Sequence, residues 1–189
     1  MKRKQILLSI SLCVASLSLQ AAEVVRSGQF VTIRPDGGEA RVVRLQVVND
    51  RIIRVQATAA SELPQKQPSL IIVEQKAKPV FEVKEDGRAV RVVAAEVQAV
   101  VDKQTGEVVF LDADGKKLLG ETKSGKHFWP YRVPDREIGV DVGKVTEAQR
   151  HGLTWQMAFD TQQGEALYGL GQHQSEELNM LGKNEDLFQ

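Results

Sequence analysis

The sequence predicts an all-β protein whose antiparallel strands form a sandwich or a barrel. From Gln29 onward, apolar residues occupy alternate positions in short runs. Gly, Asp, Asn and Pro recur between these runs at hairpin spacing. No window shows a sustained helical period. Periodicity alone does not separate an open sandwich from a closed barrel, so both remain open at this point.

The strands follow from the alternation and from the turns that bound it. The segment Pro35–Gly38 reverses the chain, because proline presets φ and glycine accepts positive φ. The next strand then places Val43, Leu45 and Val47 on one face. Strands are expected at residues 30–33, 40–48, 52–57, 70–73, 80–84, 89–94, 96–102, 107–111 and 116–119.

The alternation of apolar and polar residues is less regular in the C-terminal third of the chain. Residues 121–133 show no clear alternation and are expected to form a long connection. Trp155, Met157 and Phe159 alternate with smaller or polar residues, which predicts one more strand. The apolar run 166–170 is expected to form a short strand.

The first residues have the layout of a secretory signal peptide. Lys2, Arg3 and Lys4 form a basic region, and an apolar run to Leu19 follows that is too short to span a bilayer comfortably. Small residues around the end of the run favour a mature start at Ala22. We therefore expect a signal peptide at 1–21, a sandwich domain at 22–189, and export to the periplasm or the extracellular space, without stable membrane insertion.

Charge and cysteine content exclude several function classes. The single cysteine, Cys13, lies within the leader, so the mature chain forms no internal disulfide. A lipoprotein leader would place a small residue before this cysteine, and Leu12 stands there instead. Loss of the three basic residues at 2–4 leaves 22 basic against 25 acidic residues. Nothing indicates a nucleic-acid groove.

Candidate chemistry in the sequence is sparse. Glu176 and Glu177 are adjacent carboxylates, but neighbours on a strand point to opposite faces, whereas a retaining glycosidase holds its pair about 5 Å apart across one sugar. The segment Asp112–Gly115 begins like a calcium loop, yet two lysines follow, so a hairpin turn is expected. Gly169 and Gly171 lack the continuation of a phosphate loop. No metal site, cofactor site or catalytic residue is predicted.

Two features are candidates for substrate contact. Phe128, Trp129 and Tyr131 gather around a proline, and aromatic faces stack on pyranose rings. The preferred alternative is that they close one end of the sandwich, because large aromatics more often bury area. His173 lies between two glutamines but has no second ligand or carboxylate at a useful spacing.

A longer string near the C-terminus is specific enough to indicate a family. Tyr168-Gly169-Leu170-Gly171, continuing through Gln172-His173-Gln174 to Leu187-Phe188-Gln189, resembles glycoside hydrolase family 31, and within it bacterial α-xylosidases that act on xyloglucan fragments. The resemblance implies a galactose mutarotase-like antiparallel β-sandwich, incomplete at its C-terminal end, and it favours the sandwich over the barrel. In that family two aspartates of a (β/α)8 barrel perform retaining hydrolysis. Neither aspartate motif is matched here.

The resemblance implies a role in support of catalysis. The sandwich would wall the active site of a barrel elsewhere in the full-length chain, with carbohydrate as substrate. Weak candidates for substrate contact are Trp129, Tyr131, His173 and Gln189. Two other function classes remain: a non-catalytic carbohydrate-binding module, and an exported sandwich that binds only protein. The module is favoured if Trp129 and Tyr131 are exposed and coplanar.

Overall fold

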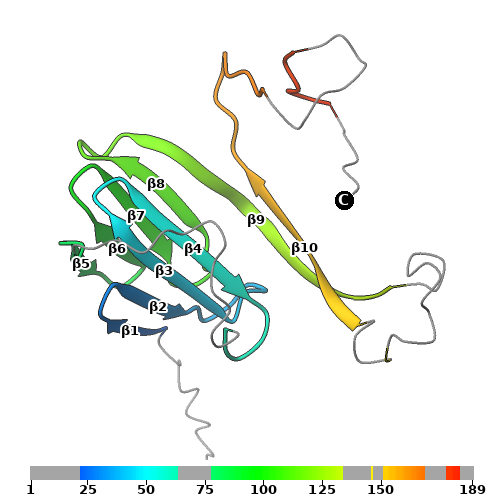
Figure 1. Ribbon diagram of the computed structural model, residues 1–189, viewed down its shortest axis with the longest axis horizontal. Coiled ribbons are helices and arrows are strands. Elements are labelled where there is room, and N and C mark those ends of the chain that lie inside the picture. Colours follow the sequence, from blue (N-terminus) through cyan, green and yellow to red (C-terminus); the bar gives the residue numbers. More distant parts are fainter. Residues whose placement is uncertain (1–21, 64–77, 134–145, 147–150, 169–177, 184–189) are drawn as a thin grey trace, which may run out of the picture.

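The computed structural model describes residues 22–63, 78–133, 146, 151–168 and 178–183. Within these ranges the chain forms two antiparallel sheets and no helix (Figure 1). The first sheet has the order β1-β2-β3-β4, and the second has the order β10-β9-β8-β7-β6-β5. No helix in the described part of the chain is long and apolar enough to cross a membrane.

Every neighbouring pair of strands within a sheet is antiparallel. The four-stranded sheet contains β1 (Glu23–Ser27), β2 (Phe30–Arg34), β3 (Val42–Asn49) and β4 (Ile52–Thr58). The six-stranded sheet contains β5 (Glu82–Glu85), β6 (Ala89–Val93), β7 (Val97–Asp102), β8 (Val108–Asp112), β9 (Lys117–Arg132) and β10 (His151–Phe159).

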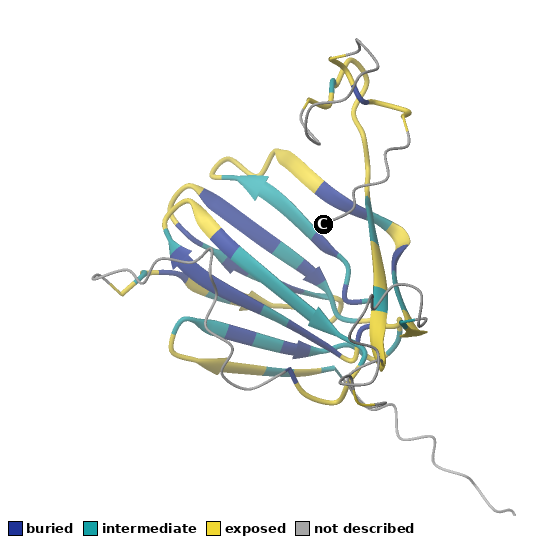
Figure 2. Cartoon of the chain, turned by 45° about the vertical axis from the view of Figure 1, so that its right-hand side comes forward, coloured by how far each residue is buried: buried dark blue, intermediate teal, exposed yellow. Residues whose placement is uncertain are grey.

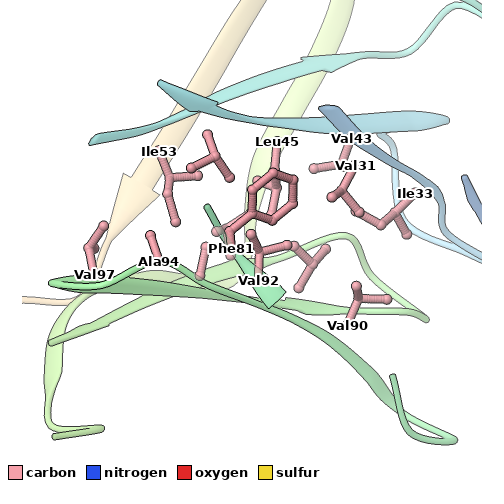
Figure 3. Packing of buried hydrophobic residues seen from close by; sticks show 14 of the residues in the cluster. Val31, Ile33, Val43, Leu45, Ile53, Phe81, Val90, Val92, Ala94 and Val97 are labelled. Atoms are coloured by element: carbon pink, nitrogen blue, oxygen red, sulfur yellow. The ribbon is translucent and has the colours of Figure 1, made fainter. Parts of the chain in front are cut away.

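The core lies between the two sheets (Figure 3). Val43, Leu45 and Val47 of β3 are completely buried, as their shared face predicts. Val90 and Val92 of β6 face them from the other sheet, with Phe81 between the layers. The predicted sandwich is therefore confirmed, because apolar faces of two separate sheets pack against each other.

Backbone contacts join the two layers at both ends. Asp36 and Gly37 donate hydrogen bonds to the carbonyls of Lys103 and Gln104, at 3.0 and 2.8 Å. Gly38 adopts φ +76°, and a Cβ there would lie 2.5 Å from the carbonyl oxygen of Thr105. Only glycine therefore fits this approach. At the opposite end, Glu96 N donates to Asp50 O at 3.0 Å.

Three expectations from the sequence need correction. Residues 121–133 are not a connection, because β9 runs to Arg132. The strand β1 begins before Gln29, at Glu23; four of its five residues are exposed, so it lacks the alternation of a half-buried strand. Residues 166–168 of the expected strand 166–170 lie outside any strand, and Leu167 instead bonds Asn179 and Met180. The expected strand 70–73 lies outside the described residues.

The other predicted elements agree with the structure. The remaining strands match to within about two residues, except that the strand expected at 116–119 continues as β9. The segment Asp112–Gly115 forms the turn between β8 and β9, where Asp112 Oδ1 accepts hydrogen bonds from Asp114 N and Lys116 N. The hairpin prediction for this segment is thus confirmed.

Leu45→Ala should lower the free energy of unfolding by about 2–5 kcal/mol, because it leaves a cavity at a completely buried site. Urea denaturation measures the change. Val25→Ala is the matched control, since Val25 is exposed on the edge strand β1, and it should stay within about 0.5 kcal/mol of the parent. Equal losses from the two variants would contradict this placement of the core.

Candidate functional site

The strand β9 changes partner halfway along its length. Residues 117–120 of β9 pair with β8, whereas residues 126–132 pair, within the described part of the chain, only with β10. Between these halves the register jumps, because Met157 of β10 faces Lys126 and Phe159 faces Glu121. The extra residues form a bulge in which Ser124 adopts φ +54°. We call the paired segments 126–132 and 151–157 the ribbon; Figure 1 shows it running past the other strands.

A buried ion pair closes the base of the ribbon. Lys126 Nζ lies 3.0 Å from Glu121 Oε2, and the two side chains are 7% and 3% exposed. Lys126 Nζ also donates to the carbonyl of Gly106 at 3.0 Å, and Val108 N donates to Glu121 Oε2 at 3.2 Å. The pair therefore joins the two sides of the bulge to each other and to the start of β8.

One face of the ribbon turns toward the edge of the four-stranded sheet. Side chains at paired positions share a face, so Phe128 and Trp155 lie on this side. Together with β4 this face encloses a cleft of about 350 Å³. The cleft is lined by Val55, Ala57, Thr58, Lys126, Phe128, Leu153, Trp155 and Met157. We call this side of the ribbon the inner face.

The opposite side, the outer face, has a different composition. It carries His127, Trp129 and Tyr131 at alternate positions of β9, which we call the ring row. The residues paired with them on β10 are Gln156, Thr154 and Gly152, in that order. The rings of His127 and Trp129 have centroids 6.4 Å apart and planes inclined by 49°. Neither ring therefore covers the other as in a stack.

A glutamate from the loop between β2 and β3 holds the base of the ring row. Glu39 Oε1 lies 2.7 Å from Nδ1 of His127, and Phe128 N donates to Glu39 Oε2 at 2.7 Å. A carboxylate only accepts hydrogen bonds, so Nδ1 carries the hydrogen. The hydrogen bond from His127, followed by that from Phe128, lowers the pKa of Glu39 below its ordinary value. The ionised carboxylate thus belongs to the folded arrangement.

The structure divides the aromatic cluster expected from the sequence. Phe128 is partly buried and packs against the core. This agrees with the alternative in which the aromatic side chains close one end of the sandwich. Trp129 and Tyr131 lie on the outer face and are 42% and 41% exposed. Figure 2 shows exposed stretches along the ribbon, at the right of that view. The candidates His173 and Gln189, like Glu176 and Glu177, lie outside the described residues.

Sequence reasoning missed His127 and Glu39. The alternation of His127, Trp129 and Tyr131 is a strand signal, but Pro130 within the run obscures it. Proline fits here because this half of β9 pairs with β10, and no strand among the described residues pairs with its other edge. Glu39 carries no local signal, since 88 residues separate it from His127. The described residues contain no group of three or more His, Cys, Asp or Glu that would hold a metal ion.

Comparison with known proteins gives a family match and similar crystal structures, including those of two α-xylosidases. Residues 42–188 match the glycosyl hydrolase 31 N-terminal galactose mutarotase-like domain. A GH31 α-xylosidase from Xanthomonas citri is 34% identical with a TM-score of 0.68, over 84% of this chain and 16% of that one. A GH31 α-xylosidase from a soil metagenome, complexed with xylose, shares the fold at 21% identity and a TM-score of 0.56. That match covers 85% of this chain and 24% of the other.

Lys126→Met should destabilise the protein by about 3–5 kcal/mol, because it leaves Glu121 charged and buried without its cation. Urea denaturation measures the loss, and amide hydrogen exchange reports whether the ribbon opens first. The double variant Glu121→Leu/Lys126→Met removes both charges and should recover most of the stability. A loss below about 1 kcal/mol in the single variant would contradict the role of the pair.

Acidification should release Glu39 from the ring row at a pH below the ordinary glutamate range. A lowered pKa in the folded state means that the stabilising contribution is present above the pKa of the unfolded chain, and is lost as the pH falls through the folded pKa. The amide proton shift of Phe128 should report this titration. Glu39→Gln should abolish it. A midpoint at or above the ordinary range in the parent protein would refute the arrangement.

Proposed function

The chain belongs to the family of glycosyl hydrolase 31 N-terminal galactose mutarotase-like domains, and from that membership we propose that it is the non-catalytic N-terminal domain of an exported α-xylosidase. In this role the sandwich lies against a catalytic (β/α)8 domain and forms a wall beside its active site. The proposed substrates are xyloglucan-type oligosaccharides. The chain supplies neither catalytic aspartate, so the retaining hydrolysis belongs to the other domain.

Sequence similarity supports the proposed enzyme type. The chain is 34% identical to an α-xylosidase over most of its own length, but it spans only 16% of that enzyme. In the two solved α-xylosidases the matching region is a small part of a longer chain, 16% of one and 24% of the other. The expected signal peptide at 1–21 lies outside the described residues and supports export through its sequence pattern alone.

The observation that carries the docking role is the exposed apolar surface at the inner face of the ribbon. Trp155 is 66% exposed and Leu153 is 51% exposed, although they extend a face whose other members pack against the sandwich. A two-stranded ribbon is marginally stable alone in water, and exposed apolar surface of this kind marks contact sites. The catalytic domain is the proposed occupant, because this side continues the cleft beside β4.

The docking proposal predicts that a separately expressed family 31 catalytic domain raises the melting temperature of this chain. Trp155→Ser should remove most of the increase, because it deletes a large apolar contact from the inner face. Val25→Ser is the matched control on the exposed edge strand β1 and should keep the increase. A melting temperature unchanged by the catalytic domain would refute the docking role.

The isolated chain should not hydrolyse an aryl α-xyloside or an aryl α-glucoside above the buffer rate. The reaction needs two carboxylates about 5–5.5 Å apart on either side of the anomeric carbon, and no motif of the family supplies them here. Release of the aryl group, followed by absorbance, measures turnover. Turnover above the buffer rate by the purified chain would place catalysis within this domain.

A further inference from the structure

The outer face of the ribbon combines three ring side chains with an open flank. Alternate residues on a strand lie about 6.8 Å apart, so the three rings of the ring row follow one another at about this spacing along one face. On the β10 side Gly152 stands opposite Tyr131, and a Cβ built on Gly152 meets no atom within 4 Å. Among the described residues, the surface beside Gly152 is therefore flat and accessible to a planar ligand.

The polar groups around the ring row are placed for hydroxyl recognition. Thr154 stands opposite Trp129, and Gln156 stands opposite His127. Both side chains donate and accept hydrogen bonds. Glu39 accepts the hydrogen bond from Nδ1 of His127, so Nε2 is the ring nitrogen left to contact a ligand at the far edge of the imidazole. The ring row thus joins aromatic faces to a hydroxyl, an amide and an imidazole.

The two faces of the ribbon favour different partners. The inner face surrounds Trp155 with Leu153, Met157 and Phe128, an environment that matches an apolar protein surface. The outer face surrounds Trp129 with the hydroxyl of Thr154, the amide of Gln156 and the imidazole of His127. A pyranose has this dual character, because its axial C–H faces stack on aromatic rings while its rim of hydroxyls donates and accepts.

We propose that the outer face of the ribbon is a non-catalytic binding site for neutral pyranose oligosaccharides. Trp129 and Tyr131 stack on sugar rings, while His127, Thr154 and Gln156 bond the hydroxyl groups. The site is separate from the docking surface, because the ribbon itself lies between the two. It does not depend on the proposed enzyme activity, which supplies only the choice of sugar for the test.

The test follows the indole N–H signals of Trp129 and Trp155 in an NMR titration of the whole chain. Trp129→Phe and Trp155→Phe assign the two signals. With a xyloglucan heptasaccharide as the probe, the Trp129 signal should shift and saturate, and the Trp155 signal on the opposite face should stay in place. Mannitol, an open-chain polyol, should shift neither signal, because it has no ring face to stack.

Two variants test the site in different ways. Trp129→Ala should weaken binding about tenfold or more, since it removes the largest stacking surface. Gly152→Gln keeps all three rings but raises a side chain beside Tyr131, where space is open, and it should weaken binding by blockage. Val25→Ser on β1 should leave the affinity unchanged.

The outcomes separate this site from the docking role. Binding localised at Trp129 and lost in Gly152→Gln supports the site, whether or not a catalytic domain stabilises the chain. Absence of a shift up to ~10 mM sugar, where even millimolar affinity would be seen, overturns it. A shift at Trp155 instead of Trp129, or an equal response to mannitol, also overturns it.

Discussion

The ion pair between Glu121 and Lys126 is the interaction on which the geometry outside the core depends. Burial of two charges is costly unless their remaining hydrogen-bonding capacity is satisfied, and here Gly106 O and Val108 N complete it. The pair spans the β9 bulge, so it determines where the strand leaves the six-stranded sheet. The direction of the ribbon is thus anchored in the same turn region, 103–106, that joins the two layers.

The direction of the ribbon determines what each of its faces meets. Phe128 and Met157 close the cleft beside β4, and the inner face then continues outward through Leu153 and Trp155. The same pleat presents His127, Trp129 and Tyr131 on the other side, with Glu39 holding the first of them. A single two-stranded element therefore presents two different surfaces, an apolar one proposed for a protein domain and the ring row proposed for a carbohydrate. Its function rests on the packing that orients it.

Sequence reasoning succeeded where the pattern was local. Val43, Leu45 and Val47 alternate, and all three are completely buried between the sheets. It failed on residues 121–133, because Pro130 and the residues of the bulge break the alternation that identifies a strand. It selected Trp129 and Tyr131 as candidates but grouped them with Phe128, since adjacency in sequence does not reveal which face a side chain takes. His173 and Gln189 remain predictions.

By itself the sequence determined the fold class, most of the strands and the family, because alternation, turn residues and the motif string 168–189 are each read from a contiguous stretch of sequence. Only the tertiary structure decided the partners of those strands: the pairing of Glu121 with Lys126 across a bulge, the reach of Glu39 to His127, and the division of the aromatic cluster between two faces. These contacts arise from register and from chain segments up to 89 residues apart. Such distances are set by the packing of whole sheets, which no local pattern encodes.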